Sequence, residues 1–486
     1  MDWKGIAVEF ITTFNLLVLF YFLILNTIYL LLFLVSLREV WVFVRRTFFS
    51  DYRQLMQSEL TWPISVLVPA RNEEKTIVET IHSLQMVNYG EFEIIVVNDG
   101  SSDETLARLI EAFELRRIDK VYRRAIATEK VRGVYASLEQ ANLLVVDKEQ
   151  GGKADALNAG INVARYPLFC SVDADSVIEE DALLRVVKPF MENPRETVAV
   201  GGIVRIVNGC TIRDGRVVDI ELPRRPLVIF QVVEYLRAFL TGRVGWSALQ
   251  SLLIISGAFG LYRRDEVLAV GGYDRDTDTE DLELVVRLHQ HMRLKKQPYQ
   301  IVFVPDPVCW TEVPSSWKVL RRQRYRWHRG LLQSLWRHKR MMFNPRYGVL
   351  GLLAMPYFVI FEMFGPFIEI AGYLAVILSW FLGLLNWHFF LLFLFMAFLY
   401  GIFLSLAAVL LEEISFRRYP KWEDLMKLLL FAVVENLYYR QALSLFKVKS
   451  FYDFIRRTRR WGEMERAGFR KEAMTPAAQQ RMRAAP

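Results

Sequence analysis

Residues 93–100 read EIIVVNDG, in which four consecutive β-branched residues are followed by Asn98, Asp99 and Gly100. This composition is typical of a buried strand that ends in a turn. Three similar runs occur nearby, ISVLVPA (64–70), ANLLVVDK (141–148) and PLFCSVDAD (167–175). Stretches with helical spacing, such as 74–85 and 153–163, separate them. Strands that alternate with helices predict an α/β fold with a mainly parallel sheet covered on both faces.

Acidic residues follow two of these predicted strands. In parallel α/β sheets ligands bind beyond the carboxyl ends of the strands. Asp99 is placed there to accept hydrogen bonds from a nucleobase or ribose, although residues 101–103 also suit a simple turn and helix cap. Asp173 and Asp175 lie one residue apart, which suits Mg²⁺ or Mn²⁺ completed by substrate phosphates. The alternative is a pair of solvated loop carboxylates.

Two further stretches suggest chemistry at helix starts. Lys153 in GGKADALNAG (151–160) lies near a predicted helix N-terminus, where an anion would be stabilised. The P-loop pattern is absent, and a plain loop-to-helix junction is the alternative. Asp281 in DTDTEDLELVVRL (276–288) is a candidate general base. Taken alone, that cluster is better explained by favourable interaction with the helix dipole.

The ends of the chain are rich in apolar segments. Hydrophobic residues make up 53% of the chain, and residues 14–37 are long and apolar enough to span a bilayer. Arg38, Arg45 and Arg46 follow, which predicts an external N-terminus and a cytoplasmic domain after it. Further apolar runs cover 347–385, 389–411 and 425–446. The number of crossings after residue 346 stays open. We expect four parts: an anchor (1–46), a cytoplasmic domain (47–346), membrane or interfacial helices (347–450) and a basic tail (451–486).

The basic stretch RRQRYRWHRG (321–330) has three candidate ligands. The net charge of +8 is a mild bias for 486 residues, and no nucleic-acid-binding fold is visible, so we expect no nucleic-acid partner. Anionic lipid and a substrate diphosphate remain. The three cysteines form no CxxC pair, which predicts neither a disulfide framework nor a zinc site.

The motifs stand in a characteristic order along the chain. They are VPARNEE (68–74), Asp99, Asp173–Ala174–Asp175, SGAFGLYRR (256–264), Thr279–Glu280–Asp281, and Gln323 with Arg326 and Trp327 in a Gln-x-x-Arg-Trp pattern. As an ordered set they resemble the processive membrane glycosyltransferases of family 2. That group includes the cellulose, hyaluronan and poly-N-acetylglucosamine synthases. The resemblance covers residues 60 to about 340, and the flanking apolar segments agree with it.

The resemblance implies a GT-A fold and a UDP-sugar donor. It places the uridine against Ala70, Arg71, Glu73 and Asp99. The metal, Mg²⁺ or Mn²⁺, would be held by Asp175 with Asp173. The remaining site residues it implies are Asp281 as base with Glu280 beside it, Lys153, Gly257 in the loop at the acceptor end, Gln323, Arg326 for the diphosphate and Trp327 for stacking on the acceptor sugar.

The implied activity is an inverting, processive β-transfer that builds a polysaccharide at the membrane, with its export left open. The partners would be the donor, the growing polysaccharide and membrane lipids, with export or regulatory proteins left open. The location would be the plasma (inner) membrane, multi-pass, with a cytoplasmic catalytic domain. Transfer of one sugar to a lipid carrier and an inactive scaffold are the alternatives. Outside the motifs, we expect lipid contacts at Arg321, Arg322 and Arg329. Either an exit path or interfacial placement would explain Glu362, Glu369 and Glu435.

Overall fold

The computed structural model describes residues 3–48, 61–213, 215–419 and 421–456. Residues 457–486 of the expected tail, and 49–60 between the anchor and the first strand, lie outside this range. Most of the described strands join in one sheet. They are β1 (Ile64–Ala70), β2 (Phe92–Asp99), β3 (Leu115–Ile118), β4 (Val131–Ser137), β5 (Leu143–Lys148), β6 (Leu168–Val172), β7 (Ser176–Ile178), β8 (Thr197–Ile206), β11 (Phe259–Arg263) and β12 (Gln300–Thr311).

The sheet runs β3-β4-β5-β2-β1-β6-β11-β8-β12-β7. The four strands that the sequence predicts, β5, β2, β1 and β6, are neighbours and are all parallel, which confirms the prediction for the centre. Strands β4, β11 and β7 pair antiparallel with their neighbours, so the sheet as a whole is mixed. A separate hairpin is formed by β9 (Thr211–Arg213) and β10 (Arg216–Asp219).

The core of the sheet is formed by the predicted apolar runs. Val66, Leu67, Ile95 and Val96 are fully buried because helices cover both faces of the sheet. Along α5, every residue after Lys153 is buried. The helices of this part are α3 (Ile77–Gln85), α4 (Thr105–Ala112), α5 (Lys153–Val163), α6 (Ala182–Glu192), α7 (Pro226–Leu236), α8 (Val244–Ala248), α9 (Arg264–Ala269), α10 (Glu280–Lys295) and α11 (Trp317–Arg337).

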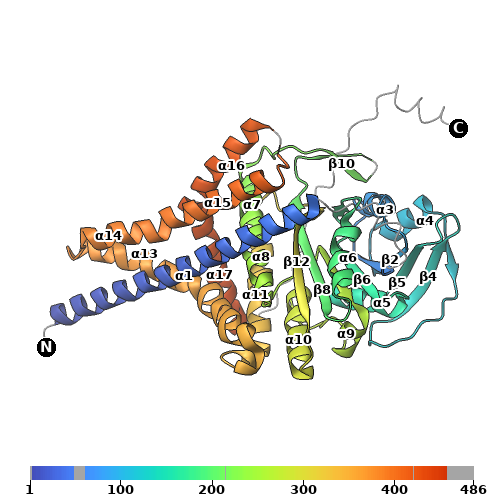
Figure 1. Cartoon of the computed structure of the whole chain (residues 1–486), viewed down its shortest axis with the longest axis horizontal. Helices are drawn as coiled ribbons and strands as arrows, with labels where there is room; N and C mark the ends of the chain where they lie inside the picture. The colour runs from blue at the N-terminus through green and yellow to red at the C-terminus, as the bar shows by residue number, and fades with distance from the viewer. Residues whose placement is uncertain (1–2, 49–60, 214, 420, 457–486) are drawn as a thin grey trace.

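Long apolar helices extend from one side of this α/β part (Figure 1). They include α1 (Trp3–Phe48), α13 (Gly365–Phe381), α14 (Trp387–Leu394) and α15 (Tyr400–Ser415). By length and composition, the stretches Val8–Arg46 and Trp387–Ser415 are each able to cross a membrane. The helical stretches Leu350–Met363 and Gly365–Phe381 meet at an angle of 46°. If together they form one span, the number of candidate crossings among the described residues is three. The chain is therefore a membrane protein.

The last apolar run contains polar residues because it packs against protein. It forms α16 (Trp422–Val434), the π-helical turn η7 (Glu435–Tyr439) and α17 (Arg440–Ile455). Glu435 is fully buried, forms an ion pair with Arg237 and accepts a hydrogen bond of 2.6 Å from the Ser405 hydroxyl. This corrects the expectation that Glu435 lines an exit path or lies in the interface.

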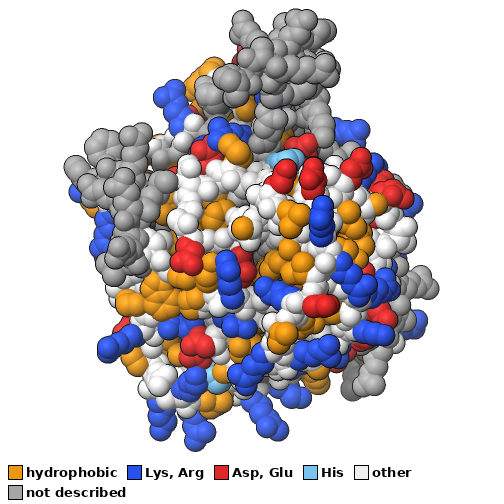
Figure 2. Space-filling model, turned by 90° about the vertical axis from the view of Figure 1, so that its right-hand side faces the viewer, with side chains coloured by type: hydrophobic (Ala, Val, Ile, Leu, Met, Phe, Trp, Pro, Cys, Tyr) orange, Lys and Arg blue, Asp and Glu red, His pale blue; other side chains and the backbone are white. Residues whose placement is uncertain are grey.

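The opposite end of the molecule is charged. Figure 2 views the molecule from the side of β4 and α4 and shows many Lys and Arg side chains with Asp and Glu between them. Charges of both signs that separate the apolar areas from one another are typical of a water-facing surface. The apolar helices and the charged surface thus lie at opposite ends of the chain's longest dimension.

Candidate active site

A cavity of about 860 Å³ lies between the sheet and the apolar helices. One side is built by residues that follow the carboxyl ends of strands, and the other by residues of α1, α13 and α17. Most of the residues predicted from the sequence line it: Lys153, Asp173, Asp175, Gly257, Glu280, Asp281, Gln323, Arg326 and Trp327. The fold therefore brings together motifs that are up to 174 positions apart in the sequence.

The centre of the site is a cluster of carboxylates around one ammonium group. Asp173 and Asp175 lie in the tight turn between β6 and β7. The Nζ of Lys153 lies 2.6 Å from Asp173 Oδ1 and 3.3 Å from Glu280 Oε1, and it donates to the Gly257 carbonyl at 3.3 Å. Burial lowers the pKa of Lys153, but the carboxylates of Asp173 and Glu280 outweigh it and the pKa is raised overall. The cluster therefore already holds one cation.

Asp281 lies beside this cluster in the first turn of α10. Its Oδ2 accepts a hydrogen bond of 2.8 Å from the Gly257 N–H, and its Oδ1 accepts one of 2.8 Å from the Leu282 N–H. Burial and the charge of Glu280 raise the pKa of Asp281, against the lowering effect of Lys153. A carboxylate held in this way, with a raised pKa, suits a general base.

Gly257 is required by the close contact between Lys153 and Asp281. A Cβ at this position would lie 2.9 Å from Lys153 Nζ and 3.1 Å from Asp281 Oδ2. A side chain would therefore push the base and the lysine apart. The predicted role of Gly257 near the acceptor remains a proposal, but its position beside the base is clear.

Helix α11 carries the Gln-x-x-Arg-Trp pattern to the same cavity. Gln323 is buried, Trp327 is half-buried and Arg326 is exposed. The helix is fixed to the segment before α10 by an ion pair between Arg329 and Asp278, with Arg329 Nη2 donating to Asp278 Oδ1 at 2.8 Å. The prediction that Arg329 contacts lipid headgroups is wrong, because its side chain is 7% exposed and paired. Arg321 and Arg322 are exposed on the same helix.

Two family models match the chain. Glycosyl transferase family 2 matches residues 65–265, and glycosyl transferase family group 2 matches residues 168–412, slightly more than half of the chain. The chain belongs to glycosyl transferase family group 2. The mixed α/β sheet with acids at its carboxyl edge is the GT-A type of fold that the resemblance implied, so this prediction is confirmed.

Curated relatives of this family 2 glycosyltransferase are poly-β-1,6-N-acetyl-D-glucosamine synthases. The Staphylococcus epidermidis protein is 32% identical over 278 residues, which cover 56% of each chain. The Staphylococcus aureus (strain COL) protein is 32% identical over 270 residues, 55% of this chain and 54% of the relative. The chain therefore spans slightly more than half the length of the curated relatives it matches. A mannosyltransferase structure from Pyrobaculum calidifontis, solved with GDP-Man and Mn²⁺, shares 19% sequence identity at a TM-score of 0.48, over 87% of this chain and 99% of that one.

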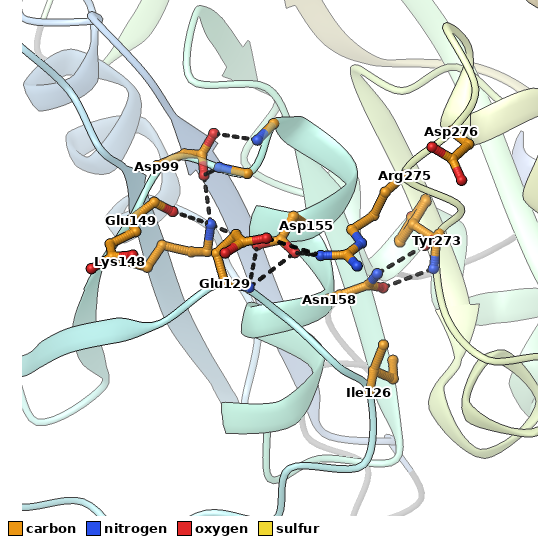
Figure 3. A network of polar contacts seen from close by, with 12 residues as sticks. Asp99, Ile126, Glu129, Lys148, Glu149, Asp155, Asn158, Tyr273, Arg275 and Asp276 are labelled. Atoms are coloured by element: carbon orange, nitrogen blue, oxygen red, sulfur yellow. Dashed lines mark hydrogen bonds and ion pairs between the residues drawn. The ribbon is translucent and has the colours of Figure 1, made fainter.

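In this family 2 glycosyltransferase, Asp99 is part of a buried polar network (Figure 3). Asp99 is 2% exposed, and it accepts hydrogen bonds from Lys148 Nζ at 2.6 Å, from Gly151 N at 2.8 Å and from Gly152 N at 2.7 Å. Lys148 Nζ also lies 2.6 Å from Asp155 Oδ1. In this structure Asp99 thus fixes the glycine turn that leads into Lys153, and it does not line the cavity.

The other predicted uridine residues follow β1. Ala70 and Glu73 are buried, whereas Arg71 is exposed. Glu73 stabilises the start of α3, because Thr76 Oγ1 donates to its Oε2 at 3.0 Å. None of these three residues lines the cavity. Their role toward a nucleotide therefore remains a proposal.

No sequence pattern indicated Arg243, which the fold adds to the cavity. Its guanidinium lies 3.8 Å from the ring centroid of Phe239. Burial lowers the pKa of Arg243 to about 10, although Asp281 acts in the opposite direction. The surrounding sequence, TGRVG, fits no catalytic pattern, and only the packing of η1 (Arg237–Arg243) against the cavity identifies it.

The carboxylates fit a divalent cation that substrate oxygens complete. Within the described residues, no group of three or more His, Cys, Asp or Glu side chains is arranged to enclose a metal. Asp173 and Asp175 nevertheless offer hard oxygen ligands, and the ammonium at Asp173 shows that a cation is stabilised there. Mg²⁺ and Mn²⁺ commonly bind in this way, through one or two carboxylates and the phosphates of the substrate.

Proposed function

We propose that this chain is an inverting, processive β-glycosyltransferase that uses a UDP-sugar to build a polysaccharide at the membrane. The observation that carries the proposal is one continuous cavity, which runs from the carboxylate cluster to residues of the apolar helices. The identity to poly-β-1,6-N-acetyl-D-glucosamine synthases supports a polymer product, and suggests N-acetylglucosamine as the first sugar to test. The location that follows is the plasma (inner) membrane, multi-pass, with the catalytic part cytoplasmic.

The donor side of the reaction is assigned to the carboxylate cluster and the basic residues near it. Asp175 and Asp173 would hold Mg²⁺ or Mn²⁺, which supplies charge stabilisation for the departing diphosphate. Lys153 and Arg326 add positive charge for the same phosphates. Ala70, Arg71, Glu73 and Asp99 are proposed to shape the uridine pocket, with Asp99 acting through the turn at residues 151–152 that it fixes.

The acceptor side is assigned to Asp281 and α11. Asp281 takes the proton from the acceptor hydroxyl as that oxygen attacks the anomeric carbon, and the UDP oxygen leaves with the bonding electrons. A single base with attack from the opposite face implies inversion. Glu280 contributes by raising the pKa of the base. Trp327 stacks on the acceptor sugar, and Gln323 lies one helical turn before it on the same face.

The product path would continue between the apolar helices. Glu362 and Glu369 line the same cavity as Asp281. Glu369 accepts hydrogen bonds from Ser444 at 2.7 Å and Tyr373 at 2.8 Å, and Lys447 Nζ lies 3.2 Å from Glu362 Oε2. Both carboxylates are thus paired, as expected where ionisable groups within apolar segments face protein or water. A sugar polymer offers hydroxyl groups that suit such a lining.

The test is a donor panel with the detergent-purified chain. UDP release and product size are measured for several UDP-sugars with Mg²⁺ or Mn²⁺, and Asp281→Asn is the control. We expect release from one donor, a high-mass product and loss of both in the variant. Release without a polymer would replace the proposal with transfer of one sugar to a lipid carrier. Absence of release, together with absence of metal-dependent UDP binding, would favour the inactive scaffold.

A further inference from the structure

The indole ring of Trp327 is held by a residue that the motif leaves unspecified. Arg324 Cζ lies 4.3 Å from the centroid of the Trp327 ring, which is the geometry of a cation–π contact. Arg324 is 6% exposed and lines the cavity together with Trp327. The two residues are three positions apart on α11, so they meet on one helix face.

The guanidinium of Arg324 is fixed in turn by two other elements. Its Nη2 donates to Glu234 Oε2 on α7 at 2.8 Å. The hydroxyl of Tyr439, on η7, donates to the same oxygen at 2.8 Å. Tyr439 is 1% exposed, and its ring stacks on that of Phe230 with 5.0 Å between the ring centroids. The contacts therefore form a chain from Tyr439 through Glu234 and Arg324 to Trp327.

A purely structural role explains this chain poorly. A buried ion pair is usually no more stabilising than apolar residues of the same volume, because both charges lose their hydration. Among the described residues, Arg324 Nε is buried and makes no hydrogen bond, which adds to that cost. The gain is geometric: the planar guanidinium holds the indole in one orientation, and a stacking platform needs a fixed plane.

We propose that Arg324 is the positioning residue of Trp327, oriented by Glu234 and Tyr439. The guanidinium covers one face of the indole and leaves the other for the acceptor sugar. Because Tyr439 belongs to the C-terminal helices that adjoin the cavity, this chain couples the acceptor platform to the membrane part. The inference rests on the proposed function, since it concerns the acceptor of that reaction.

The first readout is independent of activity. The full chain is labelled with 5-fluorotryptophan, and the ¹⁹F resonance of Trp327 is assigned with Trp327→Phe. We expect Arg324→Met, Glu234→Gln and Tyr439→Phe each to shift that resonance. The exposed Arg321 on the same helix provides the matched control, and Arg321→Ala should leave the resonance in place. Tyr439→Phe removes only one hydroxyl, so it tests the chain without a large effect on folding.

The second readout separates positioning from structure. With the sugar donor that wild type uses, the apparent KM for an added oligosaccharide acceptor should rise about fivefold in Arg324→Met, and the polymer should shorten. The KM for the donor should stay unchanged. Arg324→Lys keeps a cation over the ring and should restore part of the acceptor KM.

Two results would overturn the inference. A Trp327 resonance that does not move in Arg324→Met would show that the contact is absent. A resonance that moves while acceptor KM and product length stay at wild-type values would show a structural contact only. If wild type itself makes no polymer and releases no UDP, the proposed function fails, and the acceptor role of Arg324 fails with it, whereas the resonance still decides the contact.

Discussion

A Cβ atom at Gly330 would lie 2.2 Å from the Oγ1 of Thr279. Helix α11 therefore touches the residue before Glu280 and Asp281 with no room for a methyl group. Thr279 immediately precedes α10. The residues before Gly330 and Thr279, Arg329 and Asp278, form an ion pair that holds the helix and the loop together at the same place. The base and the Gln-x-x-Arg-Trp residues thus depend on one close helix–loop contact.

Gly330→Ala should misplace α11 relative to Asp281. The added methyl group also meets Thr279 Cγ2 at 2.5 Å, so either the helix or the threonine must shift. A shift of roughly 1 Å in such a site can lower turnover by about 100-fold. The measurement is UDP release with the best donor. A Gly330→Ala variant that releases UDP at the wild-type rate would contradict the prediction.

Arg329→Ala should destabilise the protein and should not change lipid binding. The variant leaves Asp278 largely buried without its cation, which costs on the order of 3 kcal/mol for buried pairs. The checks are the thermal unfolding midpoint and flotation with anionic liposomes. Arg321→Ala, on the exposed side of the same helix, should leave the midpoint unchanged. Loss of liposome binding with an unchanged midpoint would restore the lipid role for Arg329.

The acidic limb of the pH–rate profile should lie above the ordinary carboxylate range. Burial and Glu280 raise the pKa of Asp281, whose ordinary value is about 3.9. The base acts only when deprotonated, so kcat/KM falls as the pH drops through that raised pKa. Glu280→Gln removes a like charge and should move the limb to lower pH. UDP binding is measured over the same range, and a limb that follows loss of UDP binding would refute this assignment.

Lys153→Met should increase the affinity of the nucleotide-free protein for Mn²⁺. The Lys153 ammonium lies 2.6 Å from Asp173 and competes with a metal for the same oxygen. Removing one positive charge at this distance should strengthen metal binding by about tenfold or more. Calorimetric titration with Mn²⁺ alone gives the affinity, and Lys153→Arg, which keeps the charge, should behave like wild type. An affinity equal to or weaker than that of wild type would count against the competition.

The protein should lose stability between about pH 6.5 and pH 4, in part because of His289. Its Nε2 lies 2.8 Å from the Leu252 carbonyl and its Nδ1 2.8 Å from the Tyr299 hydroxyl. Burial lowers the pKa of His289 to about 4. In this pH window the unfolded chain binds a proton that the folded chain does not. The free energy of unfolding therefore decreases as the pH is lowered. His289→Gln should show a smaller drop in unfolding midpoint between pH 7.5 and pH 5; an equal drop would exclude His289 as a source.

The centre of the fold was predictable because its signal is local. The runs at 64–70 and 93–100 form β1 and β2 almost residue for residue, since buried parallel strands need continuous β-branched sequence. The flanking strands were missed, and β11 and β8 show why. Their antiparallel pairing in the sheet depends on distant partners, such as Gly260 opposite Gly201.

The sequence indicated which residues form the candidate site, but it did not indicate how they are arranged. Asp173, Asp281 and Trp327 were chosen by motif, and they line one cavity. The roles of the individual arginines in the basic stretch were not predictable from the sequence. Arg324, Arg326 and Arg329 are alike in sequence, yet one contacts Trp327, one is exposed and one pairs with Asp278. Their positions around the helix, and the neighbours there, decide between these roles.

The sequence alone determined the parallel strands, the apolar helices and the chemistry available at the strand ends, because hydrophobic pattern and residue type act over a few neighbours. The tertiary structure decided which charges meet. Lys153 reaches Asp173 and Glu280, and Asp99 turns to Gly151 and Gly152, only because the sheet sets their strands and loops side by side. Electrostatic contacts depend on distance in space, and sequence separation carries little information about that distance.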